Sequence, residues 1–432
     1  MRRRALLTAV ATGGTVAIAG CSSSDSSCGP PSDTFDQPRD RWSTSGYAPT
    51  NTANAPAGPS SGAIQWQTDR EAGDGPRLNG WFSTPLVDDG AVYVSLRQLD
   101  RNELRDYPGY LVAFDEETGD IQWRTELPNI AGGDPALADD TVLVGDTGGT
   151  LHAFSTTGER RWRKELGAAV RTPTAVGGHV YVLDASGTVY GFTDEGEQCW
   201  KHDLGKSGFV DGLLGGGGSS FEAASAPAVD DSRVYVTVHE SPDDERLGRV
   251  VAFDHEGEQE WTYSFPTGYQ PPNTPAVVDD TVLVTGGDQI HALDATTGER
   301  LWRFVVGYRR TGPPATDGEH VYVGAKNLYA LDIGDGSEQW RVVNRAVESG
   351  TGWTNGIPFM SRVAVTDDAV YLRAGAFDRR DGSRLWGDLA EDTVLGSNYA
   401  TSYYGRHPMV LLSVTGDALY LSHQNQGVTK VA

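Results

Sequence analysis

A recurring tryptophan constrains the fold of this 432-residue chain more than any other feature of its sequence. Successive repeat tryptophans are separated by 57, 39, 38, 61, 41, 38 and 46 residues. A base period of about 40 residues with occasional insertions is typical of a propeller or a repeat array, in which each unit is one small sheet. The repeat tryptophans are Trp66, Trp123, Trp162, Trp200, Trp261, Trp302, Trp340 and Trp386.

The residues before each tryptophan follow a shared pattern, as in AFDEETGDIQW (113–123) and ALDATTGERLW (292–302). In the second stretch, Asp294 can accept hydrogen bonds from backbone N–H groups two or three residues later, and Gly298 can supply the positive φ that closes a hairpin. Each unit begins with two apolar runs around an Asp-Asp or Gly-Gly turn, such as TPAVVDDTVLVTGG (274–287). One unit therefore predicts four antiparallel strands, here called a to d, and each repeat tryptophan is interpreted as structural packing.

The units close on themselves. An eighth unit begins at Pro408 but reaches Ala432 without a tryptophan, while AIQW (63–66) supplies an outer strand with no strands before it. Joining these two pieces predicts an all-β, eight-bladed β-propeller over residues 41–432, which leaves no sheet edge at the ends of the array. Residues 41–59 are expected to run across this last blade. Complete units can be written at 83–123, 133–162, 172–200, 225–261, 274–302, 312–340 and 361–386.

The A-x-D-x-x-T-G-x-x-x-W pattern, clearest at Ala113, Asp115, Thr118, Gly119 and Trp123, resembles the tryptophan-docking motif of the pyrroloquinoline-quinone (PQQ)-type repeat propellers. The resemblance covers residues 63–432. The family includes quinoprotein alcohol dehydrogenases and also non-catalytic members, such as the lipid-anchored propeller of the bacterial outer-membrane barrel-assembly machine. The resemblance therefore implies a fold and leaves the function open.

Membership among the dehydrogenases would imply a quinone held over Ca²⁺ by Glu, Asn and Asp, an Asp base and a pair of adjacent cysteines. The cysteines of this chain, Cys21, Cys28 and Cys199, are not adjacent, and no local motif matches the metal ligands of the family. Motifs of serine hydrolases, zinc proteases and Walker-type phosphate loops are also missing from the sequence. We therefore predict no catalytic residue, no metal and no cofactor, and PQQ with calcium belongs only to the dehydrogenase alternative.

Residues 1–20 look like a twin-arginine export signal, because adjacent arginines precede an apolar run too short for a comfortable membrane span. The run ends in Ile18-Ala19-Gly20-Cys21, which resembles a lipobox, so Cys21 is the expected lipidation site. Residues 21–40 are rich in Ser, Asp and Pro and are expected to be a disordered tether. The expected location is the outer face of the cytoplasmic membrane, with two or more lipid chains needed for stable anchoring.

If Cys21 carries lipid, Cys28 and Cys199 remain. A disulfide between them is permitted in an exported protein. Since Cys28 lies in the tether and Cys199 stands beside a repeat tryptophan, the sequence leaves this pairing open.

Charge excludes one class of partner. The chain has 59 Asp and Glu against 35 Lys and Arg, a formal net charge of −24. Nucleic-acid binding needs a basic face, so nucleic acid is excluded. Only 5 of the 35 cations are lysine. A dense carboxylate surface with little lysine favours a halophilic protein, and a merely acidic mesophilic protein is the alternative.

The longest departures from the repeat lie in the d–a connections between blades and in two b–c insertions, 97–109 and 240–248. Propellers gather these connections on one face around the central channel. Arginine and aromatic side chains there suit an anionic or sugar-like ligand or a protein partner, whereas plain loop packing over the channel mouth is the structural alternative. The candidate funnel residues are Trp81, Tyr269, Arg309, Arg310, Trp353, Asn355, Tyr403 and Arg406.

From these features we predict a non-enzymatic binding or scaffold module for extracellular proteins or a ligand. A PQQ-dependent dehydrogenase and a glycan-binding surface protein are the alternatives.

Overall fold

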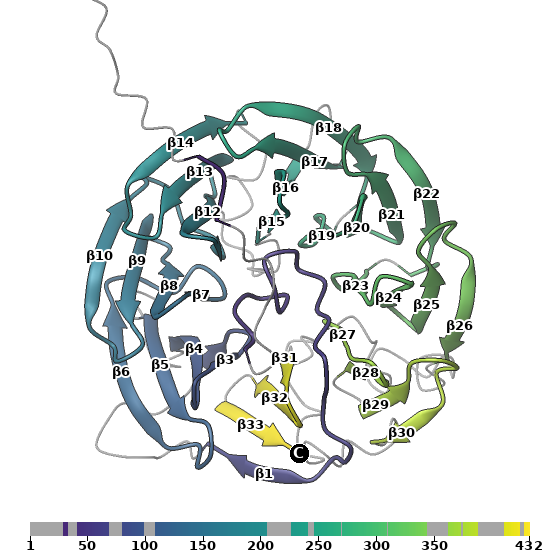
Figure 1. The fold of residues 1–432 in the computed structure, drawn as a ribbon, viewed down its shortest axis with the longest axis horizontal. Helices are drawn as coiled ribbons and strands as arrows, with labels where there is room; N and C mark the ends of the chain where they lie inside the picture. The colour runs from purple at the N-terminus through teal and green to yellow at the C-terminus, as the bar shows by residue number, and fades with distance from the viewer. Residues whose placement is uncertain are drawn as a thin grey trace, which may run out of the picture.

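The computed structural model describes residues 29–32, 41–68, 80–98, 109–204, 226–240, 246–268, 270–308, 310–343, 362–372, 375–387, 410–423 and 427–432. These residues form eight antiparallel sheets arranged as blades around a central axis (Figure 1). The predicted all-β, eight-bladed propeller is confirmed. None of the described residues lies in a helix that is long and apolar enough to cross a membrane.

Blades 1 to 8 are numbered in chain order, with β1 completing blade 8, and in each blade the a strand lines the channel and the d strand forms the rim (Figure 1). Blade 1 comprises β2 (Gly80–Phe82), β3 (Leu86–Asp88), β4 (Ala91–Gln98), β5 (Gly109–Asp115) and β6 (Ile121–Leu127). Blade 2 comprises β7 (Ala136–Ala138), β8 (Thr141–Gly145), β9 (Thr150–Ser155) and β10 (Arg160–Glu165). Blade 3 comprises β11 (Thr174–Val176), β12 (His179–Leu183), β13 (Thr188–Thr193) and β14 (Gln198–Asp203). Blade 4 comprises β15 (Ala228–Val229), β16 (Arg233–Glu240), β17 (Leu247–Asp254) and β18 (Gln259–Pro266).

The second half of the ring repeats this order. Blade 5 comprises β19 (Ala276–Val278), β20 (Thr281–Gly286), β21 (Gln289–Asp294) and β22 (Arg300–Val305). Blade 6 comprises β23 (Ala315–Thr316), β24 (His320–Gly324), β25 (Leu328–Asp332) and β26 (Glu338–Val342). Blade 7 comprises β27 (Ala364–Val365), β28 (Ala369–Leu372), β29 (Gly375–Asp378) and β30 (Arg384–Trp386). Blade 8 comprises β31 (Val410–Thr415), β32 (Ala418–His423), β33 (Gly427–Val431) and β1 (Ile64–Gln67).

The two ends of the propeller meet in blade 8. β1 pairs antiparallel with β33, with Trp66 opposite Lys430. The seam continues beyond the strands, where the Ala432 N–H donates to the Ala63 carbonyl at 3.0 Å. The predicted closure by the N-terminal strand is therefore confirmed.

Seven of the eight repeat tryptophans bond through the indole N–H to the next blade. The Trp261 indole N–H of blade 4 donates to the Ala295 carbonyl in the c–d turn of blade 5, at 2.9 Å. A Cβ built on Gly298 in that turn would lie 2.5 Å from the Trp261 ring, and Gly298 has φ +71°. Gly298 is therefore required for two reasons: its positive φ, and the close approach of the Trp261 ring, which leaves no room for a Cβ.

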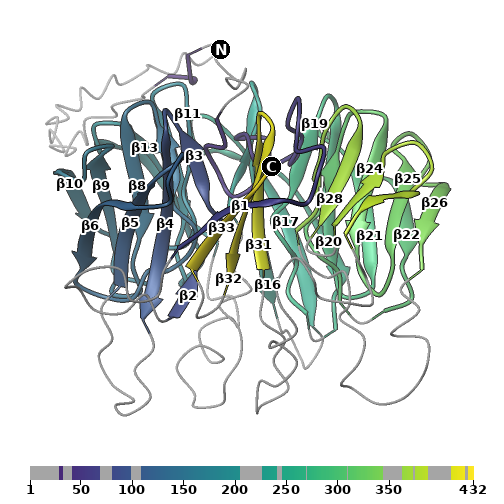
Figure 2. The same ribbon diagram turned by 90° about the horizontal axis from the view of Figure 1, so that it is seen from below.

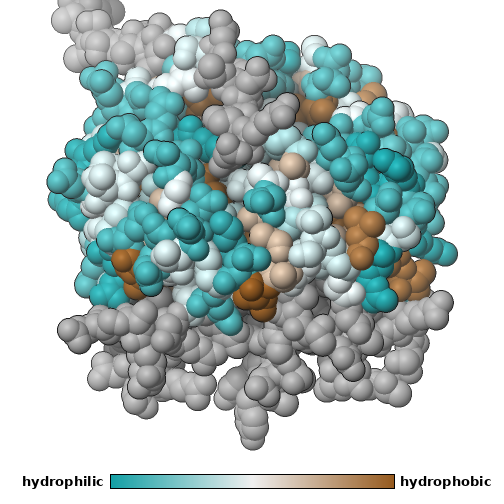
Figure 3. Space-filling model, turned by 60° about the horizontal axis from the view of Figure 1, so that its bottom comes forward, coloured by the Kyte–Doolittle hydropathy of each residue, from teal (hydrophilic) through white to brown (hydrophobic). Residues whose placement is uncertain are grey.

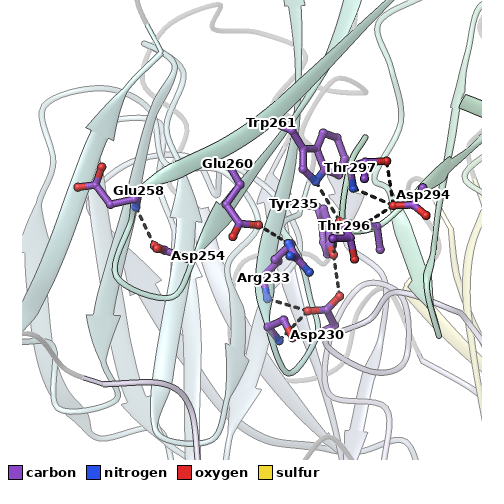
Figure 4. A network of polar contacts seen from close by, with 12 residues as sticks. Asp230, Arg233, Tyr235, Asp254, Glu258, Glu260, Trp261, Asp294, Thr296 and Thr297 are labelled. Atoms are coloured by element: carbon purple, nitrogen blue, oxygen red, sulfur yellow. Dashed lines mark hydrogen bonds and ion pairs between the residues drawn. The ribbon is translucent and has the colours of Figure 1, made fainter. Parts of the chain in front are cut away.

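A polar network secures the same joint (Figure 4). Asp294 accepts hydrogen bonds from the Thr297 N–H at 2.7 Å and the Thr296 N–H at 3.0 Å, and these bonds hold its pKa below the usual value. In blade 4, Asp230 accepts from the Tyr235 hydroxyl at 2.7 Å, while burial raises the pKa of that tyrosine. The turn chemistry predicted from the motif is present in this joint.

The same docking recurs around the ring. The indole N–H groups of Trp66, Trp123, Trp162, Trp200, Trp302 and Trp340 each donate to a carbonyl of the following c–d turn, at 2.6–2.9 Å. Trp386 differs, because its indole N–H has no partner among the described residues and its ring packs on Gly62 instead. The repeat tryptophans are thus packing residues at the blade joints.

Residues 41–55, here called the plug, occupy the centre of the ring (Figure 1). The expectation that residues 41–59 cross the last blade is wrong for this part, because the plug pairs by backbone hydrogen bonds with the innermost strands of six blades. Those strands otherwise present unpaired N–H groups to the channel, and the plug carbonyls satisfy them. The blade residues that pair with it are Val87, Leu137, Val229, Val277, Thr316 and Val365.

The plug is part of the core. Trp42, Ala53 and Ala55 have no exposed surface, and the Trp42 ring meets Tyr47 edge-on at 5.2 Å between centroids. The outer surface differs, since the described residues visible in Figure 3 are mostly hydrophilic with separate apolar spots. The exposed large apolar side chains among the described residues are Ile64, Leu301, Val305 and Leu385.

Candidate binding face

The direction of the strands gives the propeller two unlike faces. The a–b and c–d turns lie on one, here called the turn face, and the b–c and d–a connections lie on the other, the loop face (Figure 2). The plug partners Val87 and Val277 are the middle residues of three-residue strands, next to the a–b turns. The plug therefore closes the channel toward the turn face.

The predicted funnel residues fall only partly within the described structure. Trp81 lies in β2, a short strand between the d strand of blade 8 and the a strand of blade 1, and pairs opposite Arg97. Arg310 is exposed in the connection between blades 5 and 6. These two residues come from different parts of the ring. Outside the described residues lie Cys21, Tyr269, Arg309, Trp353, Asn355, Tyr403 and Arg406.

A belt of polar contacts joins neighbouring blades on the loop side of the plug. Asp134 accepts from the Thr84 N–H at 3.0 Å and from the Thr84 hydroxyl at 2.7 Å, and the Asp134 N–H donates to the Thr172 hydroxyl at 3.0 Å. All three residues come just before the innermost strand of their blade. This position therefore forms the wall of the channel.

Arg362 holds the equivalent position before β27 and is 7% exposed. Its Nη2 donates to the Ser45 hydroxyl of the plug at 3.2 Å, while Nε and Nη1 have no partner among the described residues. Burial lowers the pKa of this guanidinium, and the carboxylate of Asp134 opposes that shift. The channel wall therefore carries the buried cation Arg362, and the half-buried carboxylate of Asp134 interacts with it electrostatically.

A small hollow of about 20 Å³, partly open to solvent, lies on the loop face between blades 3, 4 and 5. Its walls include Arg171 before β11, Asp184 after β12, His239 near the end of β16, and Pro271 and Pro272 before β19. The hollow is thus lined by the buried Arg171 and Asp184, the half-buried His239 and proline rings.

Burial shifts the pKa values of two titratable groups that line the hollow, Arg171 and His239. Arg171 is 2% exposed, and burial lowers its pKa to about 10 although Asp184 acts against the shift. Asp184 is held by the Thr188 N–H at 3.0 Å and the Tyr190 hydroxyl at 3.1 Å. Burial and the charge of Arg246 lower the pKa of His239, so its imidazole is neutral at pH 7.

Sequence reasoning missed this hollow. Arg171 stands in a short connection, residues 166–172, that departs little from the repeat, so the length of the connection gives no sign of it. A signal was present, since the aligned position holds Ser83, Gly133 or Asn273 in other blades and a cation only here. A comparison of equivalent positions between blades finds it.

The described residues do not fit a calcium-bound quinone. None of them forms a group of three or more His, Cys, Asp or Glu side chains that could hold a metal ion. The carboxylate of Asp134 in the channel wall is already engaged by Thr84, and the plug fills the turn-face side of the channel. We derive no chemical step through that cofactor.

Fold and repeat together define a PQQ-type repeat propeller, as the sequence motif implied. The chain belongs to the family described as outer membrane protein assembly factor BamB, which matches residues 108–220 and 246–431, more than half of its length. No curated protein sequence matches the chain.

Solved structures share the fold at low identity. BamB from Moraxella catarrhalis is 18% identical with a TM-score of 0.51, over 85% of this chain and 88% of that one. Quinohemoprotein alcohol dehydrogenase from Comamonas testosteroni is 15% identical with a TM-score of 0.61, over 91% and 81%. The computationally designed Ika8 protein is 14% identical with a TM-score of 0.59, over 82% and 96%. At these identities the likeness shows the fold alone.

Proposed function

We propose that this protein is an exported, lipid-anchored scaffold that binds other exported proteins through its loop face. The observation that carries the proposal is the difference between the two faces. The plug closes the channel toward the turn face, whereas the loop face bears the hollow lined by Arg171, Asp184 and His239. Polar side chains on an open face can pair with groups of a protein partner.

The family supports the same class of function, because its description names an assembly factor for outer-membrane proteins. An assembly factor acts by holding other proteins. The anchor on Cys21 and the location outside the cytoplasmic membrane come from the signal sequence and are part of the proposal.

The experiment is a lipid-preserving pull-down from native membranes at high salt, followed by mass spectrometry. Two charge reversals, one at each face, provide a matched pair. Arg310→Glu alters the loop face, and Arg300→Glu, at the start of β22, alters the turn face. We expect Arg310→Glu to lower recovery of the main partner about tenfold, because a reversed charge at an interface costs on the order of 1.4 kcal/mol.

Recovery that is equal in both variants, or lower only in Arg300→Glu, would contradict a loop-face scaffold. Adding PQQ and Ca²⁺ to the purified protein tests the dehydrogenase alternative, and bound-cofactor absorbance with dye reduction would overturn the scaffold. Retention on a polysaccharide panel that is lost in Trp353→Ala or Arg309→Ala would instead establish the glycan-binding alternative.

A further inference from the structure

Residues 29–32 of the expected tether lie against the turn face of blade 3. The Ser32 N–H donates to the Gly177 carbonyl in the β11–β12 turn at 3.1 Å, and Pro31 is buried. The approach is close, because a Cβ on Gly177 would lie 2.3 Å from the Ser32 carbonyl oxygen and 2.9 Å from the Pro31 Cβ. This stretch of chain is thus placed on one defined blade.

Cys199 lies on the same blade and near the same face. It is the second residue of β14, directly after the c–d turn, and it is half-buried and disulfide-bonded. Its partner lies outside the described residues. The chain contains two other cysteines, Cys21 and Cys28.

We propose that Cys28 is the partner of Cys199, and that this disulfide staples the tether to blade 3 so that the loop face points away from the membrane. Cys28 directly precedes Gly29, and Ser32 is four positions further along the chain, a reach of at most about 14 Å. The sulfur of Cys21 is committed to lipid under the proposed function, on which the orientation rests. In bond formation, each thiol loses a proton, and the two electrons reduce a protein disulfide of the exported compartment to two thiols.

The disulfide shortens the free chain between the lipid on Cys21 and the propeller. Cys28 is seven positions from Cys21, which span at most about 25 Å when fully extended. Without the bond, the next firmly held position is Arg41 at the start of the plug, twenty residues from Cys21, a reach of roughly 70 Å. The Ser32 hydrogen bond alone contributes only about 1 kcal/mol and opens readily. The disulfide therefore decides whether the turn face stays near the lipid surface.

This orientation completes the proposed scaffold. The anchored face is the one where the plug closes the channel, so the hollow on the loop face is presented to partners on the side away from the lipid. A propeller joined to the lipid by a long free chain would present both faces equally.

The first test maps the disulfide in the full-length protein isolated from membranes. Non-reducing digestion and mass spectrometry are expected to give a peptide that joins Cys28 to Cys199, together with a lipid-modified Cys21 peptide. A free Cys199 thiol, a Cys21–Cys199 peptide or a bond to another chain would overturn the pairing. An unmodified Cys21 would overturn the orientation, and it would show this independently of the partner pull-down.

The second test measures orientation on vesicles. A fluorescent amino acid replaces Glu195, exposed in the c–d turn of blade 3, or Glu165, exposed at the loop-face end of β10. Headgroup spin-labelled lipid is expected to quench the Glu195 probe several-fold more strongly than the Glu165 probe. In Cys199→Ser the difference in quenching between the two probes is expected to shrink, because a longer free chain then joins the propeller to the lipid.

Equal quenching at both probe sites in the oxidised protein would overturn the inference, as would a difference that persists unchanged in Cys199→Ser. Near-ultraviolet circular dichroism identical to that of the parent protein shows that Cys199→Ser is folded. A Cys28→Ser variant, altered outside the propeller core, must give the same result as Cys199→Ser.

Discussion

At the scale of single residues, the blade joint depends on one glycine and one tryptophan from neighbouring blades. Gly298 sits directly on the Trp261 ring, and the same approach joins Gly336 to Trp302 and Gly382 to Trp340. A substituent on the glycine meets both an unfavourable φ and a packed ring. Packing therefore explains why the motif recurs from blade to blade within this chain.

We expect Gly298→Ala to lower the free energy of unfolding by about 3 kcal/mol, through a strained positive φ and an overpacked ring. Gly307 is a matched control in the connection after β22, with φ +67° and nothing within 4 Å of a Cβ placed there. Gly307→Ala is expected to cost only about 1 kcal/mol, since it carries the φ penalty alone. Denaturant unfolding measures both, and equal losses would contradict the role of the ring contact.

His291 on β21 makes stability sensitive to acid. Burial lowers its pKa to about 3, with Arg300 and Arg303 adding to the shift, and its Nδ1 lies 3.0 Å from the Tyr263 hydroxyl. The unfolded chain takes up a proton near pH 6.5, whereas the folded chain does not, so stability is lost as pH falls from 6.5 toward 3.

At pH 4 this histidine is expected to destabilise the folded protein by about 3 kcal/mol relative to pH 7, because each pKa unit is worth about 1.4 kcal/mol. His291→Phe is expected to remove most of that loss, whatever its effect at pH 7. Unfolding midpoints in denaturant at pH 7 and pH 4 give the comparison. The same loss in both proteins would show that other groups carry the acid sensitivity.

At the scale of elements, the plug ties six blades together through backbone groups. Trp42 anchors it with a fully buried ring. We expect Trp42→Ala to cost about 3–5 kcal/mol and to let the plug open locally. Amide hydrogen exchange should then rise at the blade residues whose N–H groups donate to the plug. These residues are Val87, Leu137, Val229, Val277, Thr316 and Val365.

Leu301→Ala on the exposed rim of blade 5 is the control and should leave these amides protected. Exchange that rises equally at every amide of the blades would show that the plug does not open as a separate unit. Unchanged exchange at the plug-bonded amides would show that Trp42 does not anchor it.

The elements also show what sequence could and could not predict. The strands and the closure at Trp66 follow from a period set by Trp, Asp and Gly, whose side chains form the joints. The plug has no such period, because its contacts use backbone groups that any residue supplies. Arg171 was missed for a related reason, since it is a single exchanged side chain in a short connection and leaves the repeat unchanged.

At the scale of the whole molecule, repulsion among the many negative charges is expected to lower the free energy of unfolding. The formal net charge is −24, and the described surface visible in Figure 3 is mostly hydrophilic. Repulsion among carboxylates favours the expanded chain, and salt weakens it, since the Debye length falls from about 10 Å at 0.1 M to about 3 Å at 1 M.

We therefore expect the melting temperature to rise by at least several degrees between 0.1 M and 1 M KCl, and to rise further toward multimolar salt. The screening part should be nearly complete by about 1 M, because the Debye length is then shorter than the distance between neighbouring surface charges. Sucrose is the control, since it favours compact states by exclusion from the surface without screening charge. Thermal unfolding followed by circular dichroism distinguishes the two effects. A melting temperature that responds to sucrose but not to 1 M KCl would contradict a fold limited by its own negative charge, and would favour the merely acidic mesophilic alternative over a salt-adapted protein.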